Sequence, residues 1–145
     1  MRFEQELSIA RPPEDVFDYV VDPAKLASWQ VHKTRVEPLS EGEPRLGFRI
    51  REHTKPPGAK EFEQIVEFTE FERPSRLHVH IVEGPQPIDG TWTFTPDGDG
   101  GTRVTCVVDG ELRGPTRFLA PIVSRAIARQ FRGYHENLRR NLEGA

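Results

Sequence analysis

The sequence has very little cysteine and no long apolar segment. Its 145 residues include one Cys, one Met, two Trp and two Tyr. A single cysteine excludes a disulfide framework within one chain and a cysteine-rich zinc site. Because no run approaches 18 apolar residues and the N-terminus lacks the apolar core of a secretory signal, we expect no transmembrane segment and a cytoplasmic protein.

Charged residues are abundant and unevenly distributed. Residues 1–112 carry 13 basic and 21 acidic side chains, whereas residues 113–145 carry seven Arg and two Glu. The arginines of the C-terminal segment either line the solvent-exposed face of a helix, which we favour, or form a surface for an anionic partner. Since the net charge of the chain is −3, it would repel a polyanion, and we expect no nucleic-acid partner.

The hydrophobic pattern is that of a sheet followed by one long helix. A chain of 145 residues has the size of one domain, which we place at residues 1–145. Period-two alternation predicts strands at residues 2–10, 33–39, 46–54, 61–71, 77–82, 88–96 and 104–108. No helical pattern interrupts the last six strands, so the sheet should be antiparallel.

Helical spacing appears after the first strand and again at the C-terminus. Pro12-Pro13 ends the first strand and opens a short helix up to Asp22-Pro23, where a second short helix leads through Leu26 to Trp29. An apolar stripe predicts a helix over residues 115–143, which would be about 43 Å long. Such a helix must lie across the sheet, and the space between a curved sheet and one helix is a natural ligand cavity.

Three segments of the chain match a known pattern: residues 9–17 (IARPPEDVF), 66–77 (VEFTEFERPSRL) and 101–105 (GTRVT). With them, the chain resembles the SRPBCC superfamily, which includes START domains and the birch-pollen allergen. It is most similar to the bacterial polyketide cyclase/dehydrase-like branch. The resemblance covers essentially the whole chain and implies an α+β helix-grip fold, in which about seven antiparallel strands curve around a long C-terminal helix. Members bind lipids, sterols, quinones, polyketides or plant hormones, and only some are enzymes.

Polar residues on faces that are otherwise apolar are the best candidates for a binding site. They are Glu52, Gln64, Gln130 and Tyr134. Because a buried polar group without a hydrogen bond costs about 1–3 kcal/mol, these side chains either pair with one another or water, or orient a ligand. Trp29 and Trp92 are either cavity walls or plain core residues. The predicted pocket comprises Trp29, Phe48, Gln64, Val66, Val79, Trp92, Phe94, Gln130 and Tyr134.

Three other motifs are weaker candidates for a functional site. His78 and His80 project to one face of a strand and could share a metal. However, the inward face of this strand is apolar, with Leu77, Val79 and Ile81, and no third ligand is evident, so we expect no metal. Cys106 is either a small buried hydrophobe, which we favour, or a nucleophile. Asp97 to Gly101 is a turn, because the twelfth position of a calcium loop would be Val108 rather than Glu.

Three functions remain open at this point. The first is binding of a hydrophobic or amphipathic small molecule without a cofactor. The second is a metal-free cyclase or dehydratase with Glu52 as base and Tyr134 as proton donor. The third is a non-catalytic interaction protein that uses the arginine-rich helix face. The chain is compatible with a monomer or a homodimer.

Overall fold

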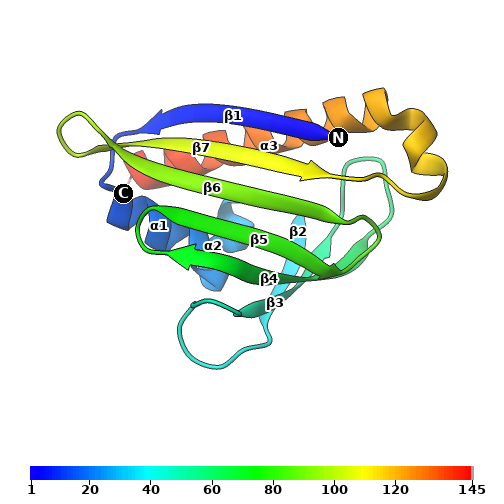
Figure 1. Ribbon diagram of the computed structural model, residues 1–145, viewed down its shortest axis with the longest axis horizontal. Helices are drawn as coiled ribbons and strands as arrows, with labels where there is room; N and C mark the ends of the chain where they lie inside the picture. The colour runs from blue at the N-terminus through cyan, green and yellow to red at the C-terminus, as the bar shows by residue number, and fades with distance from the viewer. Residues whose placement is uncertain (145) are drawn as a thin grey trace.

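Seven strands form one antiparallel sheet in the computed structural model, which describes residues 1–144 (Figure 1). The strands are β1 (Arg2–Ile9), β2 (Lys33–Pro38), β3 (Arg49–Thr54), β4 (Phe62–Glu72), β5 (Arg76–Glu83), β6 (Ile88–Asp97) and β7 (Gly101–Gly110). Their order across the sheet is β1-β7-β6-β5-β4-β3-β2, so β1 crosses over to pair with β7. The expectation of about seven strands joined without intervening helices from β2 onward is confirmed.

The helices cover one face of this sheet and leave the other face open (Figure 1). They are α1 (Pro13–Val21), α2 (Pro23–Trp29), the 3₁₀ turn η1 (Gly114–Leu119) and α3 (Ala120–Glu143). The Asp22 side chain caps α2 by accepting a 2.9 Å hydrogen bond from the Ala24 amide. Among residues 1–144, no helix has the length and apolar character needed to cross a bilayer.

The prediction of one regular helix over residues 115–143 is wrong at its N-terminal end. Residues Gly114–Leu119 form a 3₁₀ turn, and α3 begins at Ala120 with Pro121 in its first turn. Proline has no amide hydrogen to donate, so it is tolerated in the first turn of a helix but not in its interior. Pro121 therefore marks the point at which the regular helix starts.

The two halves of α3 are packed differently. The buried residues of α3, which are Tyr134, His135, Leu138 and Leu142, all lie in its C-terminal half. Asn137 and Asn141 donate from Nδ2 to the carbonyl oxygens of Trp29 (3.2 Å) and Ser28 (3.0 Å), which ties this half to α2. The N-terminal half has no fully buried residue, because it lies over a cavity instead of a solid core.

Candidate functional site

The concave side of the sheet encloses two adjoining chambers. The inner chamber, of about 90 Å³, lies between α2 and strands β3 to β7. The outer chamber, of about 410 Å³, lies under the N-terminal half of α3, and its wall includes Pro56 and Pro57 of the β3–β4 loop. Gln30, Lys33 and Gln64 belong to both linings, so they stand between the chambers. The outer chamber falls in the range of small-molecule sites, about 300–1,000 Å³.

A buried polar cluster occupies the wall between the two chambers. Lys33 Nζ lies 3.2 Å from Glu52 Oε1, and their side chains are 7% and 6% exposed. Gln64 Nε2 donates a 2.8 Å hydrogen bond to the same Glu52 oxygen. The strand register explains the assembly, because Glu52 pairs with Gln64 across β3 and β4. We call Lys33, Glu52, Thr54 and Gln64 the polar cluster.

The polar cluster has hydrogen-bonding capacity that the protein does not use. Thr54 is 4% exposed and lines the outer chamber, yet its Oγ1 has no hydrogen-bond partner among residues 1–144. Thr54 pairs directly with Lys33 across β2 and β3. An ammonium group has three donors, and the contact with Glu52 uses one of them. A hydroxyl and an ammonium therefore belong to the lining of the same chamber, on paired residues of β2 and β3.

Tyr134 presents a second polar group on the α3 side of the outer chamber. Gln130 Nε2 donates to Tyr134 Oη at 2.5 Å, which leaves the phenol hydrogen free to donate elsewhere. Burial raises the pKa of Tyr134 to about 12, and the negative charge of Glu52 acts in the same direction, against the hydrogen bond from Gln130. Tyr134 is therefore a protonated donor at neutral pH.

His135 holds the aromatic wall of the inner chamber in place. Trp92 Nε1 donates to His135 Nε2 at 3.1 Å, and His135 Nδ1 lies 2.6 Å from Gln5 Oε1, to which it donates. The imidazole also stacks on Trp29, with ring centroids 6.2 Å apart. Burial lowers the pKa of His135 to about 4, so the ring is neutral and its one hydrogen is on Nδ1.

A glycine makes room for the Trp92 ring. A Cβ atom on Gly90 would lie 2.7 Å from Trp92 Cζ3, closer than any real contact allows. Gly90 lies two residues before Trp92 on β6, and the indole ring packs over the position that a side chain would take. The absence of a side chain at residue 90 thus determines where the wall of the inner chamber lies.

Most of the residues predicted for the pocket line one of the chambers. Of these, the inner chamber is lined by Trp29, Val66, Val79 and Trp92, the outer by Gln130 and Tyr134, and both by Gln64. Glu52, predicted as a catalytic candidate, lines the inner chamber. Phe48 and Phe94 line neither chamber. They lie in the packed core, where Phe48 is 6.0 Å from the Phe68 ring and Phe94 is 5.6 Å from that of Phe17.

Three residues of the site were not predicted from the sequence. Lys33 begins a short polar strand with a weak alternation. Thr54 does continue the inward face of Ile50 and Glu52 on β3, but as a polar residue at the end of a strand, just before a proline-rich loop, it was not recognised. The position of His135 in the sequence does indicate that it is buried. It lies four residues after Phe131 and three before Leu138, which is the spacing of the apolar face of α3.

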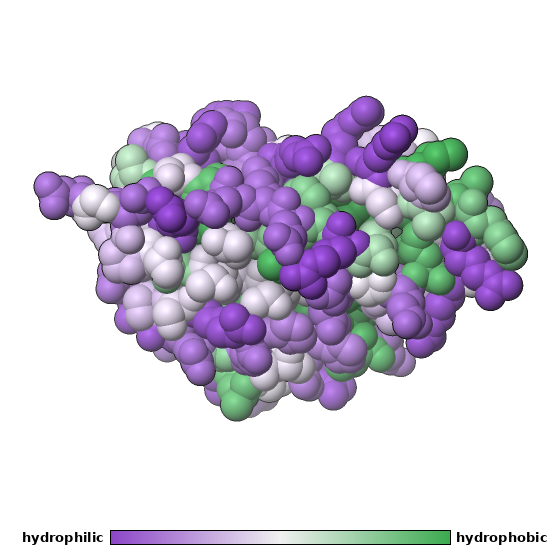
Figure 2. Space-filling model, turned by 45° about the horizontal axis from the view of Figure 1, so that its top comes forward, coloured by the Kyte–Doolittle hydropathy of each residue, from purple (hydrophilic) through white to green (hydrophobic). Residues whose placement is uncertain are grey.

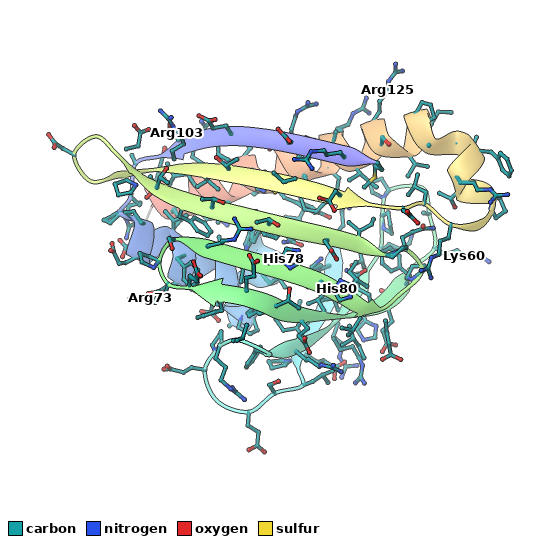
Figure 3. All side chains as sticks on the ribbon, in the orientation of Figure 1. Lys60, Arg73, His78, His80, Arg103 and Arg125 are labelled. Carbon is teal, nitrogen blue, oxygen red and sulfur yellow. The ribbon has the colours of Figure 1, made fainter. Side chains whose placement is uncertain are left out.

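The remaining motifs lie away from the cavity. His78 and His80 project from β5 on the uncovered face of the sheet, where His80 Nδ1 is 2.6 Å from Asp89 Oδ1 (Figure 3). Within residues 1–144, no group of three His, Cys, Asp or Glu side chains is arranged to hold a metal ion. Cys106 is buried, and burial raises the pKa of its thiol, so it is not an activated nucleophile.

Comparison with family models identifies the chain. Residues 1–143 match the model of the family described as polyketide cyclase/dehydrase and lipid transport. The chain belongs to this family. The search of curated protein sequences found no match. The match therefore confirms the resemblance to the SRPBCC superfamily and supports a role in hydrophobic ligand binding or polyketide cyclase/dehydrase-like chemistry.

Solved structures confirm the helix-grip fold of this polyketide cyclase/dehydrase and lipid transport family member. A Thermus thermophilus protein superposes with a TM-score of 0.84 at 24% identity, over 98% of this chain and 97% of that one. A START superfamily protein from Mycobacterium smegmatis gives 0.84 at 15% identity, over 99% and 97%. The protein Ara h 8.0201 gives 0.75 at 13% identity, over 100% and 99%. At these identities, the likeness concerns the fold.

Proposed function

We propose that this protein binds an amphipathic small molecule, with the apolar body in the outer chamber and one polar end at the polar cluster. The observation that carries the proposal is an apolar chamber of about 410 Å³ with the unpartnered Thr54 hydroxyl in its wall. Around that hydroxyl the lining is mainly apolar, with Ile81, Ile122 and Phe131 among it.

The chemistry of the polar cluster specifies what kind of polar end fits. Lys33 forms an ion pair with Glu52, and Gln64 donates a hydrogen bond to the same carboxylate, so the charges of Lys33 and Glu52 already compensate each other. A carbonyl or hydroxyl oxygen of a ligand would accept from the remaining Lys33 donors and from Thr54. A ligand without such an oxygen would leave these buried groups unsatisfied, and sites of this kind reject such analogues strongly.

Binding of a fluorescent probe tests the proposal. We expect 1-anilinonaphthalene-8-sulfonate to bind the purified protein, and 2-naphthol to displace it at lower concentration than naphthalene does. Thr54→Val should reduce this preference for 2-naphthol, because it removes the free hydroxyl and keeps the shape of the side chain. Equal displacement by the two compounds would contradict the placement of the polar end.

A pair of tryptophan substitutions provides the control for location. Ala126 lines the outer chamber, whereas Ala27 is exposed on α2 and lines neither chamber. Ala126→Trp should abolish probe binding, and Ala27→Trp should leave it unchanged. Retained binding in Ala126→Trp would place the ligand elsewhere. Mass spectrometry of a solvent extract of the protein purified from its natural source would then identify the bound molecule.

A cyclase-type activity is the second candidate, and the state of Tyr134 favours it. Its phenol is protonated and its hydrogen is not used by Gln130, so Tyr134 can donate a hydrogen bond to a substrate oxygen on which negative charge develops. Glu52, the proposed base, forms an ion pair with Lys33 at 3.2 Å and accepts a hydrogen bond from Gln64. Loss of polyketide cyclisation in Glu52→Gln and Tyr134→Phe variants that still bind the probe would support catalysis. Full activity in the double variant would refute it.

A further inference from the structure

An exposed apolar patch lies next to the mouth of the outer chamber. Phe118, Leu119 and Ile122 are 75%, 53% and 66% exposed. They lie on η1 and the first turn of α3, and Ile122 also lines the outer chamber. Figure 2 shows apolar surface gathered at the end of the molecule where Figure 1 places these two elements. We call Phe118, Leu119 and Ile122 the mouth patch.

Positive charge is concentrated in the segment of the chain that carries the mouth patch. Residues 112–135 contain five arginines and no acidic residue, and the nearest acidic residues along the chain are Glu111 and Glu136. Arg113, Arg117, Arg125 and Arg129 are exposed and form no salt bridge within the described chain. The Arg117 guanidinium lies 4.8 Å from the centre of the Phe118 ring. Arg125 points outward from α3 at the same end of the molecule as Lys60 (Figure 3).

We propose that the mouth patch docks on an anionic lipid bilayer, with its apolar side chains in the interface and the arginines at the headgroups. Apolar residues flanked by arginine on a helical segment are typical of interfacial binding, and anionic headgroups match the charge. The net charge of −3, from which we expected repulsion of a polyanion, acts less at this site, because the acidic excess lies in residues 1–112. Screening limits the reach of each exposed charge to about 10 Å at 0.1 M salt, so the arginines near the mouth patch dominate there.

Docking in this orientation would set the mouth of the outer chamber against the bilayer. Ile122 belongs to the mouth patch and also lines the outer chamber. Val123, the next residue, and Ala126, one turn further along α3, line it too. An amphipathic molecule could then pass between bilayer and chamber without crossing water. This last step rests on the proposed function, whereas docking itself does not.

Co-sedimentation with vesicles tests docking, using protein freed of ligand by solvent extraction and refolding. We expect the protein to sediment with vesicles of phosphatidylcholine and phosphatidylglycerol, and far less with phosphatidylcholine alone. Raised salt should weaken the binding. Phe118→Ser with Ile122→Ser should lower partitioning at least about tenfold, because two large apolar side chains no longer enter the interface. Arg117→Gln with Arg125→Gln should lower partitioning about 25-fold, because each arginine near an anionic surface contributes about fivefold to partitioning.

Matched substitutions elsewhere on the surface serve as controls. Leu46 is 63% exposed in the β2–β3 loop, and Arg140 is exposed near the other end of α3. Leu46→Ser with Arg140→Gln should bind vesicles as the unchanged protein does. Circular dichroism should show that all variants are folded. If Phe118→Ser with Ile122→Ser does not fold, Arg117→Gln with Arg125→Gln still tests the proposal independently.

Three results would overturn the proposal. One is absence of binding to the anionic vesicles, and another is unchanged binding by both mouth-patch variants. The third is a dimer of the unchanged protein that Phe118→Ser with Ile122→Ser converts to a monomer without any vesicle binding, which would make a second copy the partner. The probe is measured without vesicles, and neither Arg117 nor Arg125 lines a chamber. Loss of docking in Arg117→Gln with Arg125→Gln, with probe binding intact, would therefore leave the proposed function standing.

Discussion

Lowering the pH should destabilise this protein through His135. The imidazole is fully buried, and its pKa is lowered to about 4 from an ordinary value of 6.5. As the pH falls through this interval, the unfolded chain takes up a proton that the folded protein cannot accept. The free energy of unfolding is therefore unaffected by this group above pH 6.5 and decreases as the pH falls toward 4.

The size of the effect follows from the two pKa values. With about 4 in the folded state and 6.5 in the unfolded state, linkage predicts a loss of about 2 kcal/mol between pH 7.5 and pH 5.0. The cause is structural: Nε2 already accepts from Trp92, and no water-exposed site is left for a second proton. Charging the ring would break that hydrogen bond and place a cation between Trp29 and Trp92.

Urea unfolding at a series of pH values measures this loss. We compare the unchanged protein with His135→Gln, which retains one donor and one acceptor but does not titrate. The variant should be less stable at pH 7.5 and should lack about 2 kcal/mol of the pH dependence. His80→Gln, on the uncovered face of the sheet, is the matched control and should leave the contribution of His135 intact.

The reasoning would be refuted by parallel pH profiles of the unchanged protein and His135→Gln. A nuclear magnetic resonance titration in which His135 gains its proton near pH 6.5 would refute it too, because the ring would then be accessible to solvent. Carboxylates also titrate near pH 5, but they are common to both proteins and cancel in the comparison.

Three further substitutions test the packing around the site. Lys33→Met should lower the free energy of unfolding, measured by urea titration, by about 3–5 kcal/mol, because Glu52 is left buried without its cation. The double variant with Glu52→Gln should recover most of this loss. Gly90→Ala should cost about 1–3 kcal/mol and shift tryptophan fluorescence, since the new methyl group displaces the Trp92 ring; an unchanged spectrum would contradict the contact. Leu138→Ala, at a fully buried position of α3, should cost about 2–5 kcal/mol, and a smaller loss would mean that α3 is loosely packed.

The buried polar cluster could be predicted only in part. Alternation along β3 and β4 placed Glu52 and Gln64 on the inward face, because side chains on a strand alternate strictly between two faces. Lys33 was not found, since it begins a strand with a weak pattern and meets Glu52 only through the pairing of β2 with β3. A bulge between Lys33 and Arg35 shifts the register there, and a one-residue slip changes the face on which a side chain lies.

Local patterns of the sequence alone were sufficient for the seven strands, the two short helices, the antiparallel sheet and the family resemblance, but not for the start of the long helix, which begins at Ala120. These features depend on the spacing of apolar residues, prolines and glycines within one segment, and this spacing can be read directly from the sequence. Only the tertiary structure decided which inward-facing residues meet open space and which meet other side chains. Phe94 and Trp92 lie on the same face of β6, yet Phe94 packs against Phe17 while Trp92 borders the inner chamber. Contacts between residues far apart in the chain make that difference, such as those of Trp92 and Gln5 with His135.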